Sequence, residues 1–230
     1  MPISAKSFLL INILLTAAFY VFSFVALGGS VPTIESTGTE VVAWFSENGT
    51  NARIYAWAST FVSLGLMIFA GQVSALLPAP NRYIFFAGVL GFAITAQVQA
   101  WVWAGLAFHP NGLSDETARV IFAIAAYWGP VVNASSTAMA MAVAVLGFGT
   151  EKAIPPWLAW LSVLFGLEQA IETVTIFGNS GFIAPGGTMN VYFGGLLGFI
   201  WVGGVVRWSM QKLDAFNEVD LVTAAPKDGP

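Results

Sequence analysis

Two glutamates stand inside a long apolar stretch of the sequence. Glu168 and Glu172 fall between residues 156 and 177, where most of the other side chains are apolar. Residues four apart share one face of an α-helix, and Thr175 continues that face. Because ionisable groups at membrane depth are costly and mark binding sites or ion pathways, we interpret this face as a candidate site for a proton or a cation.

The protonation of this pair follows from the short distance between its members. Two carboxylates ~6 Å apart repel each other by about 3 kcal/mol at an effective dielectric constant of 20. We therefore expect the pair to hold at least one proton at neutral pH, unless a cation or an arginine lies between the carboxylates. Arg53, Arg119 and His109 fall on the matching side of the predicted membrane and are candidates for that partner.

Other polar side chains occur at a similar depth in neighbouring apolar stretches. Gln97 lies ~21 Å along its helix and Glu172 ~22 Å along its own, both measured from the same side of the membrane. Our hypothesis is one polar chamber between the third, fourth and fifth stretches, and separate helix-to-helix hydrogen bonds are the alternative for the glutamines and Asn133. The candidate binding residues are Glu168, Glu172, Gln97, Gln99, Asn133, Ser136 and Thr175.

The composition predicts that these residues belong to an all-α integral membrane protein. Hydrophobic residues make up 57% of the 230-residue chain and charged residues 9%, whereas soluble domains contain about 25% charged residues. Six apolar stretches are long enough to cross a bilayer, and they predict a six-transmembrane-helix bundle. They cover residues 8–28, 54–77, 83–108, 118–148, 156–177 and 191–210.

The fourth stretch is too long for one straight crossing. It would reach ~45 Å as a helix, against ~30 Å of hydrocarbon. Because proline removes a backbone donor, Gly129-Pro130 predicts a bend within a single tilted span. Two half-length spans are the alternative, and they would place the chain termini on opposite sides of the membrane.

A short amphipathic helix is expected between the first two spans. Thr37 and Glu40 have the spacing of a capping box, and the apolar residues Val41, Val42, Trp44 and Phe45 then fall on one helical stripe. Such a helix would lie in the membrane interface. An ordered surface loop is the alternative.

The distribution of basic residues predicts the orientation. With six spans, one side receives Lys6, Arg82, Lys152, Arg207, Lys212 and Lys227, and the other receives Arg53 and Arg119. The positive-inside rule then places both termini in the cytoplasm, with the protein in the cell (plasma) membrane. We expect one transmembrane domain over residues 1–212 and a mobile cytoplasmic tail over 213–230.

The composition also excludes several classes of site. The chain has no cysteine and one histidine, so thiolate metal sites and a bis-histidine haem cannot form within it. Eight scattered basic residues and a net charge of −4 provide no surface for nucleic acid. We therefore expect no metal, no cofactor, no catalytic nucleophile and no nucleic-acid partner.

Three functions are compatible with these features. The first is the binding or transport of a small solute or lipid, with proton or cation exchange at the glutamates. The second is an accessory or scaffold subunit that docks on a partner membrane subunit or a second copy through its small residues: Ala134, Ala138, Ala142, Gly194 and Gly198. Packing within one bundle is the alternative role for those residues. The third and least favoured is a lipid-modifying enzyme.

Overall fold

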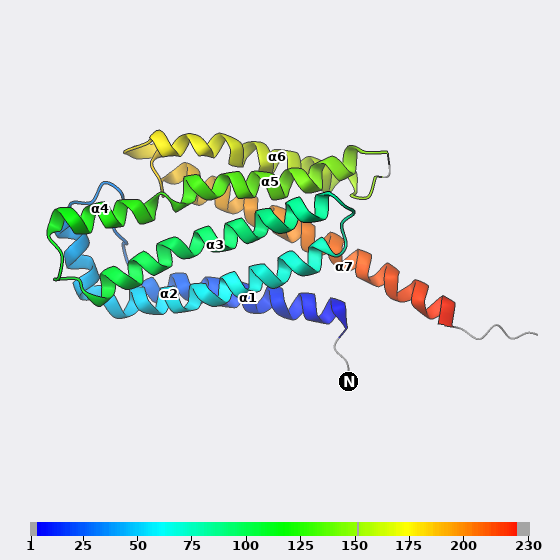
Figure 1. Ribbon diagram of the computed structural model, residues 1–230, viewed down its shortest axis with the longest axis horizontal. Coiled ribbons are helices and arrows are strands. Elements are labelled where there is room, and N and C mark those ends of the chain that lie inside the picture. The colour runs from blue at the N-terminus through cyan, green and yellow to red at the C-terminus, as the bar shows by residue number, and fades with distance from the viewer. Residues whose placement is uncertain (1–3, 151, 225–230) are drawn as a thin grey trace, which may run out of the picture.

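Membrane-length helices lie side by side in the computed structural model, which describes residues 4–150 and 152–224 (Figure 1). In that part of the chain every regular element is a helix, and six spans are long and apolar enough to cross a membrane. The prediction of an all-α six-span bundle is confirmed. The α-helices are α1 (Ala5–Leu27), α2 (Gly38–Ser74), α3 (Asn81–Phe108), α4 (Asp115–Ala126), α5 (Trp128–Phe148), α6 (Pro156–Glu172) and α7 (Gly195–Ala224).

The fourth span is bent, as expected from its length. α4 ends at Ala126 and α5 begins at Trp128, so the break falls at Tyr127. Pro130 therefore lies in the first turn of α5, where its missing N–H group disturbs no hydrogen bond within the helix. Together the two helices form one span of 34 residues, which confirms the prediction of a single bent crossing.

The expected amphipathic helix forms the first part of α2. The capping box is present, because the Thr37 hydroxyl accepts from the Glu40 N–H at 3.3 Å and Glu40 Oε2 accepts from the Thr37 N–H at 2.7 Å. The backbone kinks at Asn48, and the preceding turns run across the left end of the bundle in Figure 1. Val41 and Phe45 are buried there beside Trp103, so the apolar stripe packs on the bundle.

The capping box should contribute measurably to stability. We expect Thr37→Ala to lower the free energy of unfolding by about 1 kcal/mol, because the Glu40 N–H then loses its side-chain acceptor. Thr37→Ser keeps the hydroxyl and should remain close to the wild type. Thermal unfolding in detergent measures both variants, and equal loss in the two would show that the cap does not stabilise this helix.

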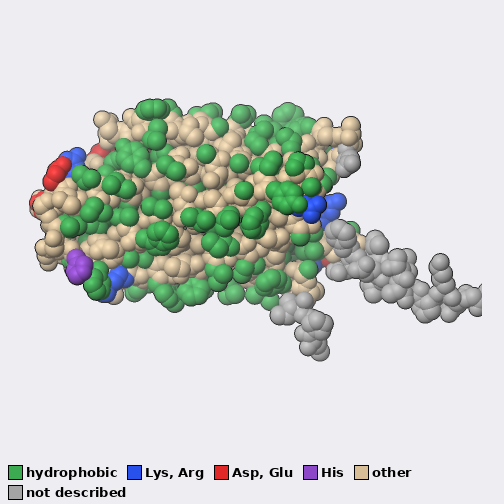
Figure 2. Space-filling view, viewed as in Figure 1, with side chains coloured by type: hydrophobic (Ala, Val, Ile, Leu, Met, Phe, Trp, Pro, Cys, Tyr) green, Lys and Arg blue, Asp and Glu red, His purple; other side chains and the backbone are tan. Residues whose placement is uncertain are grey.

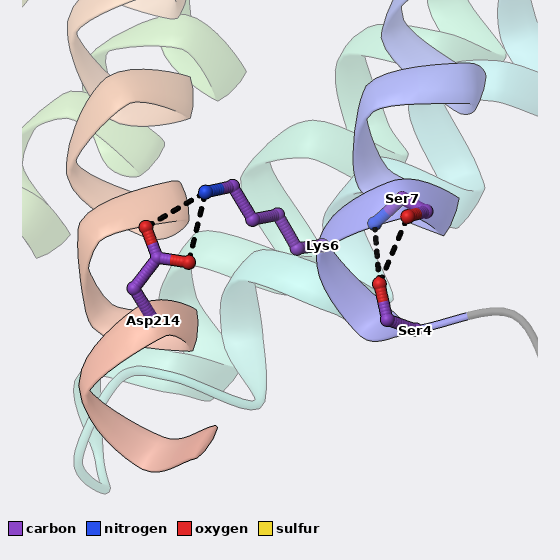
Figure 3. A network of polar contacts seen from close by, with 4 residues as sticks. All are labelled: Ser4, Lys6, Ser7 and Asp214. Carbon is purple, nitrogen blue, oxygen red and sulfur yellow. Dashed lines mark hydrogen bonds and ion pairs between the residues drawn. The ribbon is translucent and has the colours of Figure 1, made fainter. Parts of the chain in front are cut away.

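Both termini of the described chain lie at the same end of the bundle, which we call the terminus end (Figure 1). Lys6 near the start of α1 forms an ion pair with Asp214 on α7, with Nζ 2.7 Å from Oδ2 (Figure 3). Ser4 caps α1 beside this contact by accepting from the Ser7 N–H at 3.1 Å. An even number of crossings requires this arrangement.

The C-terminal segment is helical for longer than expected. α7 continues to Ala224, beyond the boundary at residue 212 that we expected between the transmembrane domain and the tail. Residues 225–230 lie outside the described residues. The mobility of the tail stays a prediction.

Charged side chains gather at the two ends of the molecule, and the side of the bundle between them shows apolar and uncharged groups (Figure 2). Large apolar residues are widely exposed along this belt, among them Leu14, Val25, Ile124, Leu164 and Leu196. Such a surface is incompatible with water and compatible with lipid tails. The chain is a multi-pass membrane protein in a lipid bilayer.

Candidate functional site

The glutamates lie near the end of α6 that is far from the termini. The packing of α6 against α5 determines which residues of α5 lie at the same depth as the glutamates. The two helices are antiparallel neighbours in which Gly147 faces Ala159, and Gly166 faces Ala140. Continuing this register brings Asn133 and Ser136 to the level of residues 169–173. The α5–α6 contact therefore places the polar residues of both helices at one depth.

The neighbour of α6 on another side is α7 with the segment that precedes it. Trp201 Nε1 donates to Ser162 Oγ at 2.8 Å, and Gly198 faces the Phe165 ring. One helical turn farther on, a Cβ atom placed on Gly194 would lie 2.5 Å from Glu172 Oε1. The Glu172 carboxyl group thus rests directly on the backbone at Gly194.

Two amide side chains hold the carboxyl groups. Gln169 Nε2 donates to Glu168 Oε2 at 2.9 Å and to Glu172 Oε2 at 3.2 Å. Asn190 Nδ2 donates to the same Glu172 oxygen at 3.2 Å. Glu168 is 6% exposed and Glu172 1% exposed. The pair is therefore a buried, bridged unit on one helix face, as its spacing predicted.

No basic side chain neutralises the pair within the described part of the chain. The ion pair found there joins Lys6 to Asp214 at the terminus end. Arg53, Arg119 and His109 form no ion pair with either glutamate. One of the two conditions under which both carboxyl groups could be charged, an interposed arginine, is therefore not met among these residues.

Several polar atoms at the level of the glutamates are buried without a hydrogen-bond partner among the described residues. They are Glu168 Oε1, Glu172 Oε1, Thr175 Oγ1, Ser136 Oγ and Asn133 Nδ2. An unsatisfied buried polar group costs about 1–3 kcal/mol, so their concentration at the α5–α6 end is unusual. We call Glu168, Gln169, Glu172, Thr175, Asn133, Ser136 and Asn190 the polar cluster.

The helices become irregular where they reach the polar cluster. α6 changes at Glu172 into the 3₁₀-helix η1 (Thr173–Phe177), and α7 is preceded by the π-helix η3 (Met189–Gly194). π-Helical turns occur frequently at functional sites. At membrane depth, such backbone persists only where it is buried in protein or lines a polar cavity.

No family model, curated protein or solved structure matches this chain. The geometry of the polar cluster is thus the basis for assigning a function.

The two predicted glutamines of the third span lie elsewhere. Gln97 Nε2 donates to the Ser59 carbonyl at 2.7 Å and to the Ser63 hydroxyl. Gln99 Oε1 accepts from the Tyr55 hydroxyl at 3.0 Å. All three partners are on α2, so for the glutamines the structure shows the alternative of separate helix-to-helix hydrogen bonds.

The remaining predicted residues lie on elements that are neighbours in the bundle. Glu168, Glu172, Thr175, Asn133 and Ser136 lie on α5, α6 and η1, which pack against one another. The segment that completes the group is η3. The printed partners of the glutamates are thus Gln169 on α6 and Asn190 on η3, whereas Gln97 and Gln99 of the third span bond to α2. The chamber between the third, fourth and fifth spans stays a prediction.

Sequence reasoning missed three residues of this region. Gln169 stands next to Glu168 and three residues before Glu172, which is a spacing that permits contact with both. Asn190 was not singled out, because it directly precedes the sixth apolar stretch at residues 191–210. Gly129 was considered only with Pro130 as part of a bend, yet a Cβ atom on it would lie 2.9 Å from Asn190 Oδ1.

The small residues serve packing within the bundle in several places. Gly194 and Gly198 face Glu172 and Phe165 of the same chain, and Ala142 is buried. Ala134 and Ala138 line a shallow open groove beside Tyr83 on α3. A second copy or partner subunit stays a prediction for that groove.

Proposed function

We propose that this membrane protein binds or moves a small solute or lipid while exchanging a proton or cation at Glu168 and Glu172. The supporting observation is a buried carboxyl pair that has amide donors but no basic partner among the described residues. Ionisable residues in this position are expensive unless they bind or transfer charge. The unpartnered oxygens beside them provide further ligands for a cation or a polar group.

The arrangement suits one shared proton. A single amide group, Gln169 Nε2, donates to one oxygen of each carboxyl group. Gln169 and Asn190 donate to the Oε2 atoms, so they stabilise one negative charge. A second charge would have no compensating basic group among the described residues. Binding a cation between the carboxyl groups would release the proton, so cation binding and proton release would be coupled.

Purified protein in liposomes tests this function. An imposed Na⁺ or K⁺ gradient, applied separately with a trapped pH-sensitive dye, should drive proton movement above that of protein-free vesicles. The expected direction is opposite to the cation flux, because one site holds either ion. The proposal would be contradicted if neither cation drove proton movement and if the infrared spectrum showed no protonated carboxyl band for the pair.

For the orientation, we propose that the terminus end faces the cytoplasm, as the basic residues predict. The chain contains no cysteine, so single-cysteine variants give an unambiguous signal. In intact cells, an impermeant maleimide should label Ser114→Cys at the far end and leave Ser4→Cys unlabelled until the membrane is opened. The reverse pattern would invert the orientation.

A further inference from the structure

The polar cluster has different surroundings on its two sides along the bundle. On the far side it continues through Asn190, which is half-buried and donates to Glu172. The Asn190 side chain packs against the backbone of α5 at Gly129. The loop that precedes η3, residues 178–188, contains no charged side chain. A polar side chain with partial exposure thus connects the buried pair with the far end.

Toward the terminus end, an aromatic layer closes the bundle. The Phe165 and Trp201 rings are stacked with centroids 5.0 Å apart, and Phe85 follows at 6.3 Å from Trp201. Beneath this layer Leu158 and Val205 are completely buried. The hydrogen bond from Trp201 Nε1 to Ser162 fixes the indole across the gap between α6 and α7. The polar groups of this layer, the Trp201 N–H and the Ser162 hydroxyl, are bonded to each other, and the other side chains named here are apolar.

We infer that the glutamate pair exchanges its proton with the far side alone, through Asn190, and that the Phe165–Trp201 layer separates it from the terminus side. This inference rests on the proposed function and adds its sidedness. The Ser162–Trp201 hydrogen bond, which we call the latch, holds this layer closed. Movement of an ion across the membrane would require the layer to open after the far-side contact closes, which is the order that prevents a leak.

Few titratable groups face the pair from the elements packed against α6. Neither α5 nor η1 contains an acidic or basic residue. η3 contributes Tyr192, which is 72% exposed. On α7, Arg207 lies over the Trp157 ring near the start of α6, toward the other end of that helix. A pH response of the site therefore belongs to Glu168 and Glu172.

Carbodiimide labelling in sealed liposomes tests the sidedness. Dicyclohexylcarbodiimide reacts with a protonated buried carboxyl group and converts it into an N-acylurea. Mass spectrometry then identifies the labelled residue. Vesicles with the terminus end outward are captured through biotin–maleimide on Ser4→Cys, and the pH on each side is then set independently. Lowering the far-side pH from about 9 to about 6 should raise labelling at least about threefold. The same change on the terminus side should have no effect.

Variants of the latch extend the test. Ser162→Ala and Trp201→Phe both remove the hydrogen bond, and Trp201→Phe keeps an aromatic ring in the layer. In either variant labelling should begin to follow the terminus-side pH. Ser209→Ala is the matched control, because it removes the hydroxyl of a buried serine on α7 that has no hydrogen-bond partner in the described part of the chain. Its labelling should follow the far side alone.

The outcomes separate the two proposals. Wild-type labelling that follows the terminus-side pH, or both sides equally, would overturn the sidedness and leave the exchange function standing. Latch variants that remain sensitive to the far side alone would overturn the role of the aromatic layer. If neither glutamate reacts at any pH on either side, the exchange function itself fails.

Discussion

Glu172→Gln is expected to reduce cation-driven proton movement in liposomes by about tenfold or more, the change that a loss of about 1.4 kcal/mol produces. Glu172 accepts from both Gln169 and Asn190, and its other oxygen is buried without a partner. The amide of the variant has no exchangeable acid proton and cannot provide a negative charge. Glu168→Gln should act in the same direction but more weakly, since Glu168 accepts from Gln169 alone.

A matched substitution elsewhere in the chain distinguishes the effect of losing a carboxylate at the glutamate pair from the effect of losing any carboxylate. Glu116→Gln makes the same chemical change at an exposed position in the first turn of α4. It should leave proton movement at the wild-type rate. Wild-type rates in both Glu168→Gln and Glu172→Gln would show that the pair takes no part in transport.

Gly194→Ala should disturb the site without removing any polar group. Its Cβ atom would lie 2.5 Å from Glu172 Oε1 and 2.8 Å from Oε2, so the carboxyl group must move. Overpacking of this kind costs about 1–3 kcal/mol. We expect lower thermal stability in detergent together with a loss of proton movement close to that of Glu172→Gln.

The adjacent glycine provides the control. A Cβ atom on Gly195 would meet nothing within 4 Å. Both substitutions gain the usual advantage of alanine over glycine in a helix, about 1 kcal/mol, so their difference isolates the contact with Glu172. Gly195→Ala should match or exceed the wild type in stability and retain activity. Equal behaviour of the two variants would contradict the placement of Glu172 against this backbone.

Features encoded by local spacing were predictable from the sequence. The capping box at Thr37, the six apolar stretches and the common face of Glu168 and Glu172 follow from helix periodicity alone. The end of α4 at Ala126 follows from Pro130, because in a continuous helix the proline ring would clash with the carbonyl group four residues earlier. None of these features depends on which helices are neighbours.

Features that depend on helix neighbours were not predictable in the same way. Depth along a helix placed Gln97 level with Glu172, but depth does not say which helix a side chain faces. The structure turns Gln97 toward α2 and supplies Asn190 to Glu172 from η3. Gly194 has a spacing shared by many packing glycines, so its contact with a carboxyl group has no signal in the sequence.

Infrared spectroscopy of the purified protein tests the central claim most directly, because a protonated buried carboxyl group has its own C=O stretching band. At neutral pH the wild type should show this band, and the double variant Glu168→Gln, Glu172→Gln should lack it. A wild-type spectrum without the band at about pH 6 and in the absence of added cations would mean that both glutamates are ionised. The pair would then not share a proton inside the bundle.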